Sequence, residues 1–268
     1  MGVVVRGPDG PLHLYSKERS NGSIAGMGYV KVVPDAGYRY HMYTLGNATF
    51  GYGVNSAGLS TSGATINCDA DTDRLGNEMT RQRQKEGKAA APLGMHMLLA
   101  TCGDVEQAIR FVTDPEAPLD FTGNMLLADR HGHAAILESV GTYQQIILCP
   151  RDQPVATMGN YPHQRADGRF AIGDNWGWAA NTMLREQLVQ RFVRERQGEV
   201  SLNEAFQLMA TRAEPGGMCQ LSFDNVGTLY STCSAIAVPR TGDFYISHGP
   251  PNQVEYVRYG LTEESESR

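Results

Sequence analysis

Cysteine and histidine are the residue types in this chain most capable of nucleophilic or metal chemistry, and neither is clustered in the sequence. The five cysteines lie far apart, without a Cys-x-x-Cys pair: Cys68, Cys102, Cys149, Cys219 and Cys233. An odd number of widely spaced cysteines is typical of reduced structural thiols. His131 and His133 flank Gly132, which is typical of a turn between two strands, and no third ligand is in view. We therefore expect neither a metal ion nor a cofactor.

The elements that must position any reactive residue begin with short strands. Val3–Val5 and Leu12–Tyr15 are β-prone runs on either side of the turn sequence Gly7–Gly10. Residues 29–33 form another such run, and residues 50–66 predict two strands around a tight turn. The first third of the chain is therefore predicted to be β-structure.

Helical periodicity begins at Pro92, where apolar residues fall on one stripe, and Asp104 is a candidate N-cap for a second short helix. Three strands are then predicted, over residues 124–129, 134–138 and 144–149. A long amphipathic helix is predicted from about Asn181 to Arg196.

The last part of the chain predicts one more helix and a hairpin. Ser201 and Glu204 form a capping-box sequence at the start of a helix over residues 202–211, and two strands follow over 232–238 and 243–247. Strands and helices therefore alternate in blocks, which favours α+β layers over βαβ units. We expect a single domain over residues 1–260 and a polar tail over residues 261–268.

The composition excludes several classes of protein. The chain has 268 residues, of which 41% are hydrophobic and 19% charged, enough for a sizeable core. The formal net charge of −6, with no segment of dense Lys and Arg, argues against nucleic acid binding. No apolar run is long enough for a membrane helix or a signal peptide. We expect a cytoplasmic protein without a membrane partner.

Four segments, in order along the chain, resemble strands of the N-terminal-nucleophile (Ntn) amidohydrolases: Gly10–Tyr15, Phe50–Leu59, Asn124–Glu138 and Leu229–Ser234. The branch they resemble contains choloylglycine hydrolase, penicillin V acylase and the penicillin-forming acyltransferase. The resemblance implies a four-layer αββα sandwich of two antiparallel sheets. It also implies a small-molecule amide or acyl substrate and a homo-oligomer.

In that family an N-terminal Cys attacks an amide carbonyl, and its own α-amine accepts the thiol proton. The resemblance makes Asn160 a candidate oxyanion donor, although an Asn turn before Pro162 is equally compatible with the sequence. Thr65 lies where a second donor is expected, and Asn67 could replace it.

The same resemblance assigns further residues to the site. Arg185 matches the Arg of a long helix, with Arg191 as a fallback, although either could be a surface residue. Three aromatic residues, together with Asn67, are candidate substrate contacts: Tyr52, Tyr161 and Trp176. We interpret the segment 174–178 as a Gly-hinged aromatic flap that excludes water and favours acyl transfer.

The nucleophile itself departs from the family pattern. The alignment places it immediately before Met1 or at Gly2, and neither residue is Cys, Ser or Thr. Lys17–Ser20 stands where the family has Arg-Asn-x-Asp, so the aspartate is missing, while Lys17 keeps the first positive charge.

Four explanations follow from this departure. A Cys could precede Met1, or removal of Met1 could expose the Gly2 α-amine as a catalytic base or nucleophile. Cys68 could act as a displaced thiol, or the fold could bind a ligand without turnover. The sequence favours an amidohydrolase or acyltransferase acting on a linear amide or acyl substrate, with a role in secondary metabolism. The alternative is a degenerate or repurposed Ntn fold.

Overall fold

The computed structural model describes residues 1–19, 27–45, 51–64, 85, 92–114, 123–140, 143–161, 176–213, 216–220 and 230–261. Their strands are β1 (Gly2–Gly7), β2 (Gly10–Arg19), β3 (Met27–Val32), β4 (Tyr40–Leu45), β5 (Gly51–Asn55), β6 (Ser60–Ala64), β7 (Gly123–Ala128), β8 (Ala134–Val140), β9 (Tyr143–Cys149), β10 (Val155–Met158), β11 (Tyr230–Val238), β12 (Asp243–Ser247) and β13 (Tyr256–Tyr259). Their helices are α2 (Pro92–Thr101), α3 (Val105–Thr113), α4 (Trp176–Glu195) and α5 (Leu202–Ala210).

The strands form two antiparallel sheets. One has the order β10-β1-β2-β11-β12-β13, and the other runs β3-β4-β5-β6-β7-β8-β9 in sequence order. In the first sheet, β1 pairs with β2 through a tight turn that ends at Gly10, where φ is +115° and glycine is favoured. β1 also pairs with β10, which follows it by about 150 residues, so the opening strand is an interior strand of its sheet.

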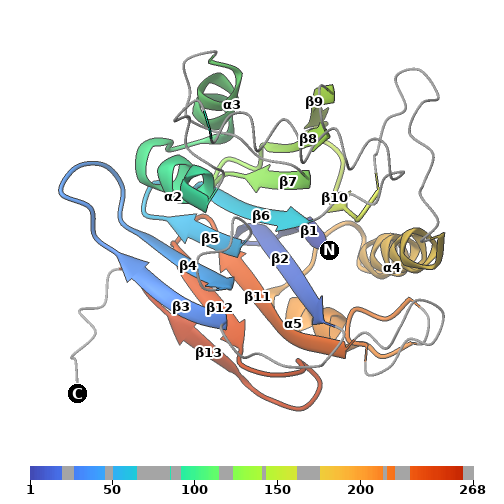
Figure 1. The fold of residues 1–268 in the computed structure, drawn as a ribbon. Helices are drawn as coiled ribbons and strands as arrows, with labels where there is room; N and C mark the ends of the chain where they lie inside the picture. Colours follow the sequence, from blue (N-terminus) through green and yellow to red (C-terminus); the bar gives the residue numbers. More distant parts are fainter. Residues whose placement is uncertain are drawn as a thin grey trace.

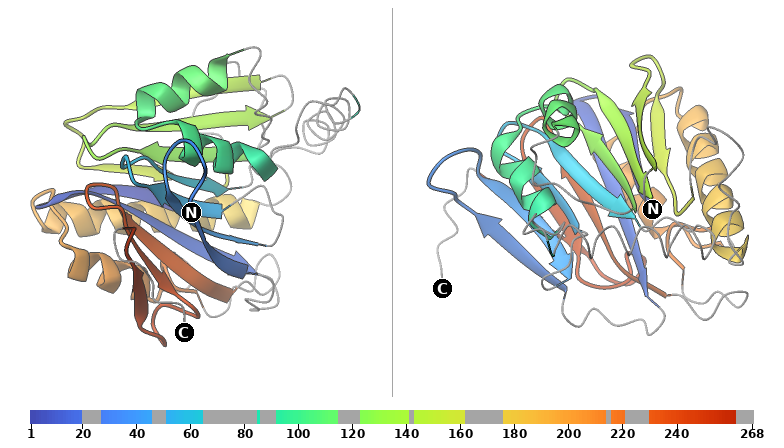
Figure 2. Two further views of the ribbon diagram at one scale, coloured as in Figure 1. Left: turned by 90° about the vertical axis from the view of Figure 1, so that its left-hand side faces the viewer. Right: turned by 45° about the horizontal axis from the view of Figure 1, so that its top comes forward.

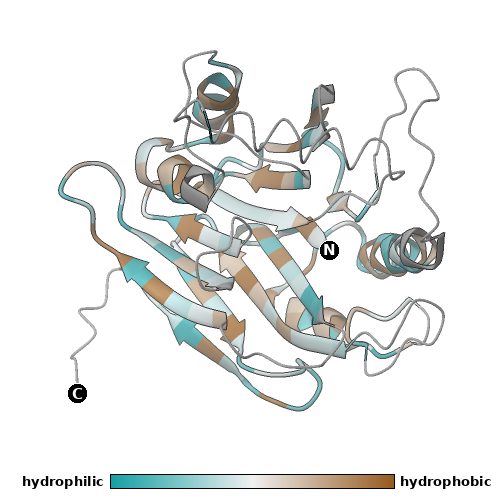
Figure 3. Cartoon of the chain, viewed as in Figure 1, coloured by the Kyte–Doolittle hydropathy of each residue, from teal (hydrophilic) through white to brown (hydrophobic). Residues whose placement is uncertain are grey.

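Four layers result, with helices on the outer face of each sheet (Figures 1 and 2). Side chains of α4 and α5, such as Val189 and Leu208, join Val3 and Leu14 of the first sheet in one core cluster. α2 and α3 pack in the same way on the second sheet. Two further clusters fill the space between the sheets. Figure 3 shows hydrophobic bands along the strands of both sheets, as expected where strands contribute to buried layers.

Local sequence signals explain where two of the helices begin. The Asp104 side chain accepts a hydrogen bond from Gln107 N at the start of α3. Ser201 and Glu204 form a reciprocal capping box at the start of α5. Among the described helices, none has the length and apolar character needed to cross a bilayer.

The structure confirms the predicted α+β class and the four-layer arrangement. It corrects the predicted aromatic flap, because Trp176, Gly177 and Trp178 are the first three residues of α4. Near a helix N-terminus several N–H groups have no intrahelical partner in any case, so a glycine there does not prevent the helix from starting. Of the predicted tail over residues 261–268, Leu261 is described and buried, and residues 262–268 lie outside the described part of the chain.

Candidate active site

The α-amine of Met1 lies inside the protein at the start of β1. The amine donates to Ser16 O at 3.1 Å, and Ser16 N donates to Met1 O at 3.0 Å, which continues the pairing of β1 with β2. Burial lowers the pKa of the amine from 8.0 to about 5; the charge of Glu18 opposes this shift, and those of Arg185 and Lys17 add to it. At neutral pH the amine is therefore uncharged and able to accept a proton.

Arg185 of α4 binds the β2 residues next to this amine. Its Nη2 donates to Ser16 Oγ at 2.9 Å, to Met218 O at 3.0 Å and to Glu18 Oε1 at 2.5 Å. Burial alone would raise the pKa of Glu18, but the charge of Arg185 outweighs it and brings the pKa to about 2. Arg185 is 2% exposed, and its Nε has no hydrogen-bond partner among the described residues.

Asn160 follows β10 at the end of the sheet where β1 begins and where the amine lies. Met158 pairs with Gly2, so the antiparallel register carries Asn160 past Met1. Asn124 Nδ2 donates to the carbonyl oxygens of Gly159 and Tyr161, both at 3.0 Å, and so holds the backbone on either side of Asn160.

A second pair of side chains joins this segment to α4. Tyr161 OH donates a short hydrogen bond to Glu186, the residue after Arg185. Glu186 is also one of the charges that raise the pKa of the Met1 amine. Asn160, Tyr161 and Arg185 are therefore gathered around the start of β1, as the sequence predicts, although their catalytic roles stay predictions.

The other predicted residues are placed differently. Gly2 is a paired residue of β1, and a Cβ added to it would lie 2.6 Å from Ser62 Oγ, so its backbone faces the inter-sheet core. Tyr52 is 3% exposed and lies between the sheets, with its OH 3.1 Å from Cys233 Sγ. Lys17 is half-buried on β2, and its charge acts on the amine.

Several predicted residues fall outside the described part of the chain: Thr65, Asn67 and Cys68. Trp176 opens α4, but its side chain is also outside the described part. Arg191, the fallback for Arg185, is exposed on α4. Arg185 is therefore the one of the two that joins Met1, Ser16 and Glu18 in the group of residues around the α-amine, the amine cluster.

Sequence reasoning missed Ser16, Glu18 and Glu186. The signal for the first two was the period-2 alternation of β2, which places Leu12, Leu14, Ser16 and Glu18 on one face, toward the helical layer. The sequence has Ser20 where the family pattern has an aspartate, which we interpreted as the loss of a carboxylate. In the structure Glu18 of β2, two positions earlier in the sequence, supplies a carboxylate that binds Arg185.

Two facing antiparallel sheets with helices on both outer faces form the four-layer αββα fold that the resemblance to the Ntn hydrolases implies (Figure 1). The chain is similar to penicillin V acylase from Agrobacterium tumefaciens, with a TM-score of 0.60 and 15% identity over 98% of this chain and 87% of that one. It is also similar to two variants of a conjugated bile acid hydrolase from Clostridium perfringens, each with a TM-score of 0.57 and 11% identity, over 97% of this chain and 96% of the other. No family model and no curated protein matches the sequence.

Proposed function

We propose that this chain hydrolyses, or transfers the acyl group of, a small-molecule amide, with the α-amine at the start of β1 as the proton acceptor. The observation that carries the proposal is the buried, uncharged amine held against Ser16 within the cluster of Arg185 and Glu18. The similar structures support it, because they are named as an acylase and a bile acid hydrolase.

The chemistry requires an external attacking group, because Met1 carries a thioether. A water molecule, or the hydroxyl or amine of an acceptor, attacks the amide carbon and gives its proton to the α-amine. The side-chain amide of Asn160 donates to the oxyanion of the tetrahedral intermediate. Collapse of that intermediate breaks the C–N bond, and the leaving amine takes the proton back from the α-ammonium group.

Arg185 is a positioning residue in this scheme. It holds Ser16 and Glu18, and through them the strand from which the amine projects. Its positive charge also helps to keep the amine unprotonated.

The test is the pH dependence of amine release from chromogenic N-acyl-4-nitroanilides of graded acyl length, with an intact mass to show which residue carries the α-amine. Turnover should fall as pH drops through about 5, because the amine becomes protonated. Lys17→Gln should move this acidic limb of the pH–rate profile to higher pH, since the Lys17 charge lowers the pKa of the amine.

Lys31→Gln is the matched control, because it removes the same charge from β3 in the other sheet. It should leave the limb in place. A limb that does not respond to Lys17→Gln, or that moves equally in the control, would rule out the α-amine as the proton acceptor.

A second candidate function is ligand binding without turnover. It is favoured by Met1, which is 2% exposed and packs in the core cluster beneath α4 and α5, and whose thioether is not a nucleophile for an amide. In that case the same anilides would raise the unfolding temperature while mass spectrometry detected no product.

A further inference from the structure

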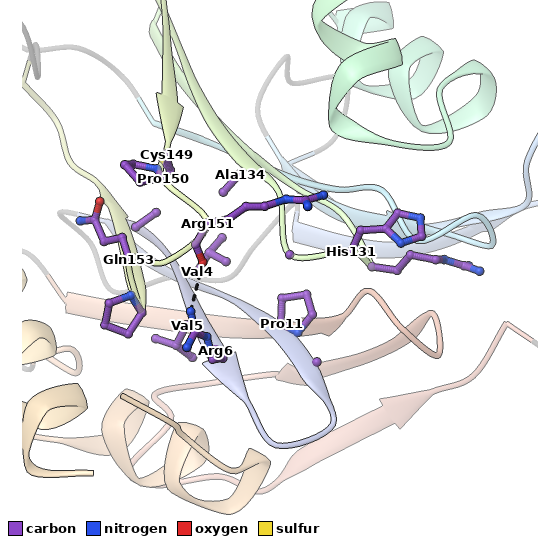
Figure 4. A pocket seen from close by; sticks show the side chains of 15 residues that line it. Val4, Val5, Arg6, Pro11, His131, Ala134, Cys149, Pro150, Arg151 and Gln153 are labelled. Atoms are coloured by element: carbon purple, nitrogen blue, oxygen red, sulfur yellow. Dashed lines mark hydrogen bonds between the residues drawn. The ribbon is translucent and has the colours of Figure 1, made fainter. Parts of the chain in front are cut away.

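A cavity of about 310 Å³ opens far from Met1 along β1. Val4, Val5 and Arg6 of β1 line it, together with the β7–β8 turn and the β9–β10 connection (Figure 4). Three to five steps of extended chain lead from Met1 to the lining residues Val4 to Arg6, which is about 10 to 17 Å at the usual rise of a strand. The cavity is therefore distinct from the amine cluster.

The charged residues that line this cavity all carry positive charge. Three arginines, Arg6, Arg130 and Arg151, contribute to the lining with His131, whereas none of the described lining residues is Asp or Glu. This is a local reversal of sign in a chain with a formal net charge of −6. Within the described residues, none of the three arginines pairs with a carboxylate.

Arg6 and Arg130 are held by backbone carbonyl groups and not by carboxylates. Arg6 Nη2 donates to Arg151 O at 3.0 Å and to Asp152 O at 3.4 Å, and so fixes the β9–β10 turn. Arg130 Nη2 donates to Ser56 O at 2.9 Å. The Arg151 guanidinium makes no hydrogen bond to any described residue, and Figure 4 shows its side chain extending across the cavity in the direction of His131.

The floor of the cavity is apolar. Val4, Ala134 and Ala156 belong to the cluster between the two sheets, and each is at most 8% exposed at this point. Pro11 of β2 and Pro154 before β10 add further apolar surface. Pockets that bind small molecules combine such apolar walls with a few polar groups that fix orientation.

We propose that this cavity binds a small organic anion. Its carboxylate or phosphate head group would contact Arg151, Arg130 and His131, and its compact apolar part would pack against Val4, Ala134 and Ala156. Arginine suits both heads, because its planar N–H donors match two oxygens of a carboxylate or a phosphate. The proposal is independent of the proposed function, since none of these residues belongs to the amine cluster.

The test is a calorimetric titration of the full chain at neutral pH and low salt with three probes that share one ring: benzoate, phenyl phosphate and benzamide. At least one anion should bind saturably and shift the NMR signals of the His131 ring, and neutral benzamide should bind at least about tenfold more weakly. The head that binds more tightly identifies the preferred anion.

Arg151→Gln should weaken anion binding about tenfold, since it removes a charge-assisted hydrogen bond. Arg194→Gln, which removes an equal charge from an exposed position on α4, is the control and should bind as the unmodified chain does. The Arg151 side chain is exposed, so this variant should keep its fold, which an unchanged thermal unfolding curve verifies. Equal binding of benzamide and the anions, equal losses in the two variants, or no saturable binding would each overturn the proposal.

Discussion

Glu18 is a carboxylate in a place where burial alone would favour the neutral acid. Its pKa lies instead at about 2, because Arg185 supplies an opposing charge and a direct hydrogen bond. Both side chains are largely shielded from water, with 3% exposure for Arg185 and 13% for Glu18. A pair of this kind is costly to break, because removing one member leaves a buried charge without compensation.

Arg185→Gln should therefore lower the free energy of unfolding by about 3 kcal/mol, as measured by urea denaturation at pH 7. The double variant Arg185→Gln/Glu18→Gln should recover much of this loss, because no isolated charge remains. Equal stabilities of the single and double variants would show that the pair does not interact in this way. Arg194→Gln, on the exposed side of α4, serves as the control for a simple loss of charge.

At the scale of elements, the approach of β10 to α4 determines where Asn160 lies. Gly159 makes this approach possible, because a Cβ at that position would come within 2.3 Å of Thr182 Cγ2 on α4. Thr182 is only 3% exposed, so it has little room to move away. The glycine is needed here for space.

Gly159→Ala should destabilise the protein by about 1 to 3 kcal/mol, the usual cost of overpacking a dense region, with the loss measured by urea denaturation. Thr182→Ser removes the clashing methyl group, so combining it with Gly159→Ala should restore part of the stability. The remaining loss reflects the Tyr161 ring, whose Cε1 would lie 2.9 Å from the new Cβ. If the two substitutions are simply additive, the clash is absent.

Elements with strong local signals are the ones that the sequence predicts. The β1–β2 hairpin has a Gly-Pro-Asp-Gly turn, and α3 and α5 begin at side chains that cap them. β4, β10 and β13 were not predicted. β10 and β13 have four residues each, and β4 is a run of mixed polar and aromatic residues without simple alternation. These strands are specified by their neighbours in the sheet, which local sequence does not reveal.

At the scale of the whole molecule, three buried basic groups contribute to the pH dependence of stability. Burial lowers the pKa of His13 to about 3 and that of His41 to about 4, and the Met1 amine lies at about 5. Each group has a higher pKa in the unfolded chain. As pH falls from 8 to 4, the unfolded chain therefore takes up protons that the folded chain does not, and stability falls.

The free energy of unfolding should accordingly decrease from pH 8 to pH 4 in urea titrations. His13 bonds Ser60 Oγ at 2.9 Å and Ser62 Oγ at 2.8 Å between the sheets. His13→Gln should flatten the slope below pH 6.5 by about 1.4 kcal/mol per pH unit, the value for one proton. An identical slope in the unmodified chain and in His13→Gln would contradict this account.

The sequence predicts only part of the site, and the reason is physical. Asn160, Tyr161 and Arg185 could be assigned by resemblance, the first two in the segment before Pro162 and Arg185 on a helix with an amphipathic pattern. The carboxylate of Glu18 could not, since its partner Arg185 is 167 residues away and meets it only when α4 packs on the first sheet. The cavity beside Arg151 likewise requires the β7–β8 turn and the β9–β10 connection to come together.

The position of β1 inside its sheet has a consequence during protein synthesis. β1 and β2 are made long before their partners, because β10 and β11 cover their two sides only after more than a hundred further residues. At about 5 to 20 residues per second, β11 follows β2 by on the order of 10 to 40 s. Throughout that interval the nascent hairpin has two unpaired edges and an exposed valine run, which are the features that favour pairing with other chains.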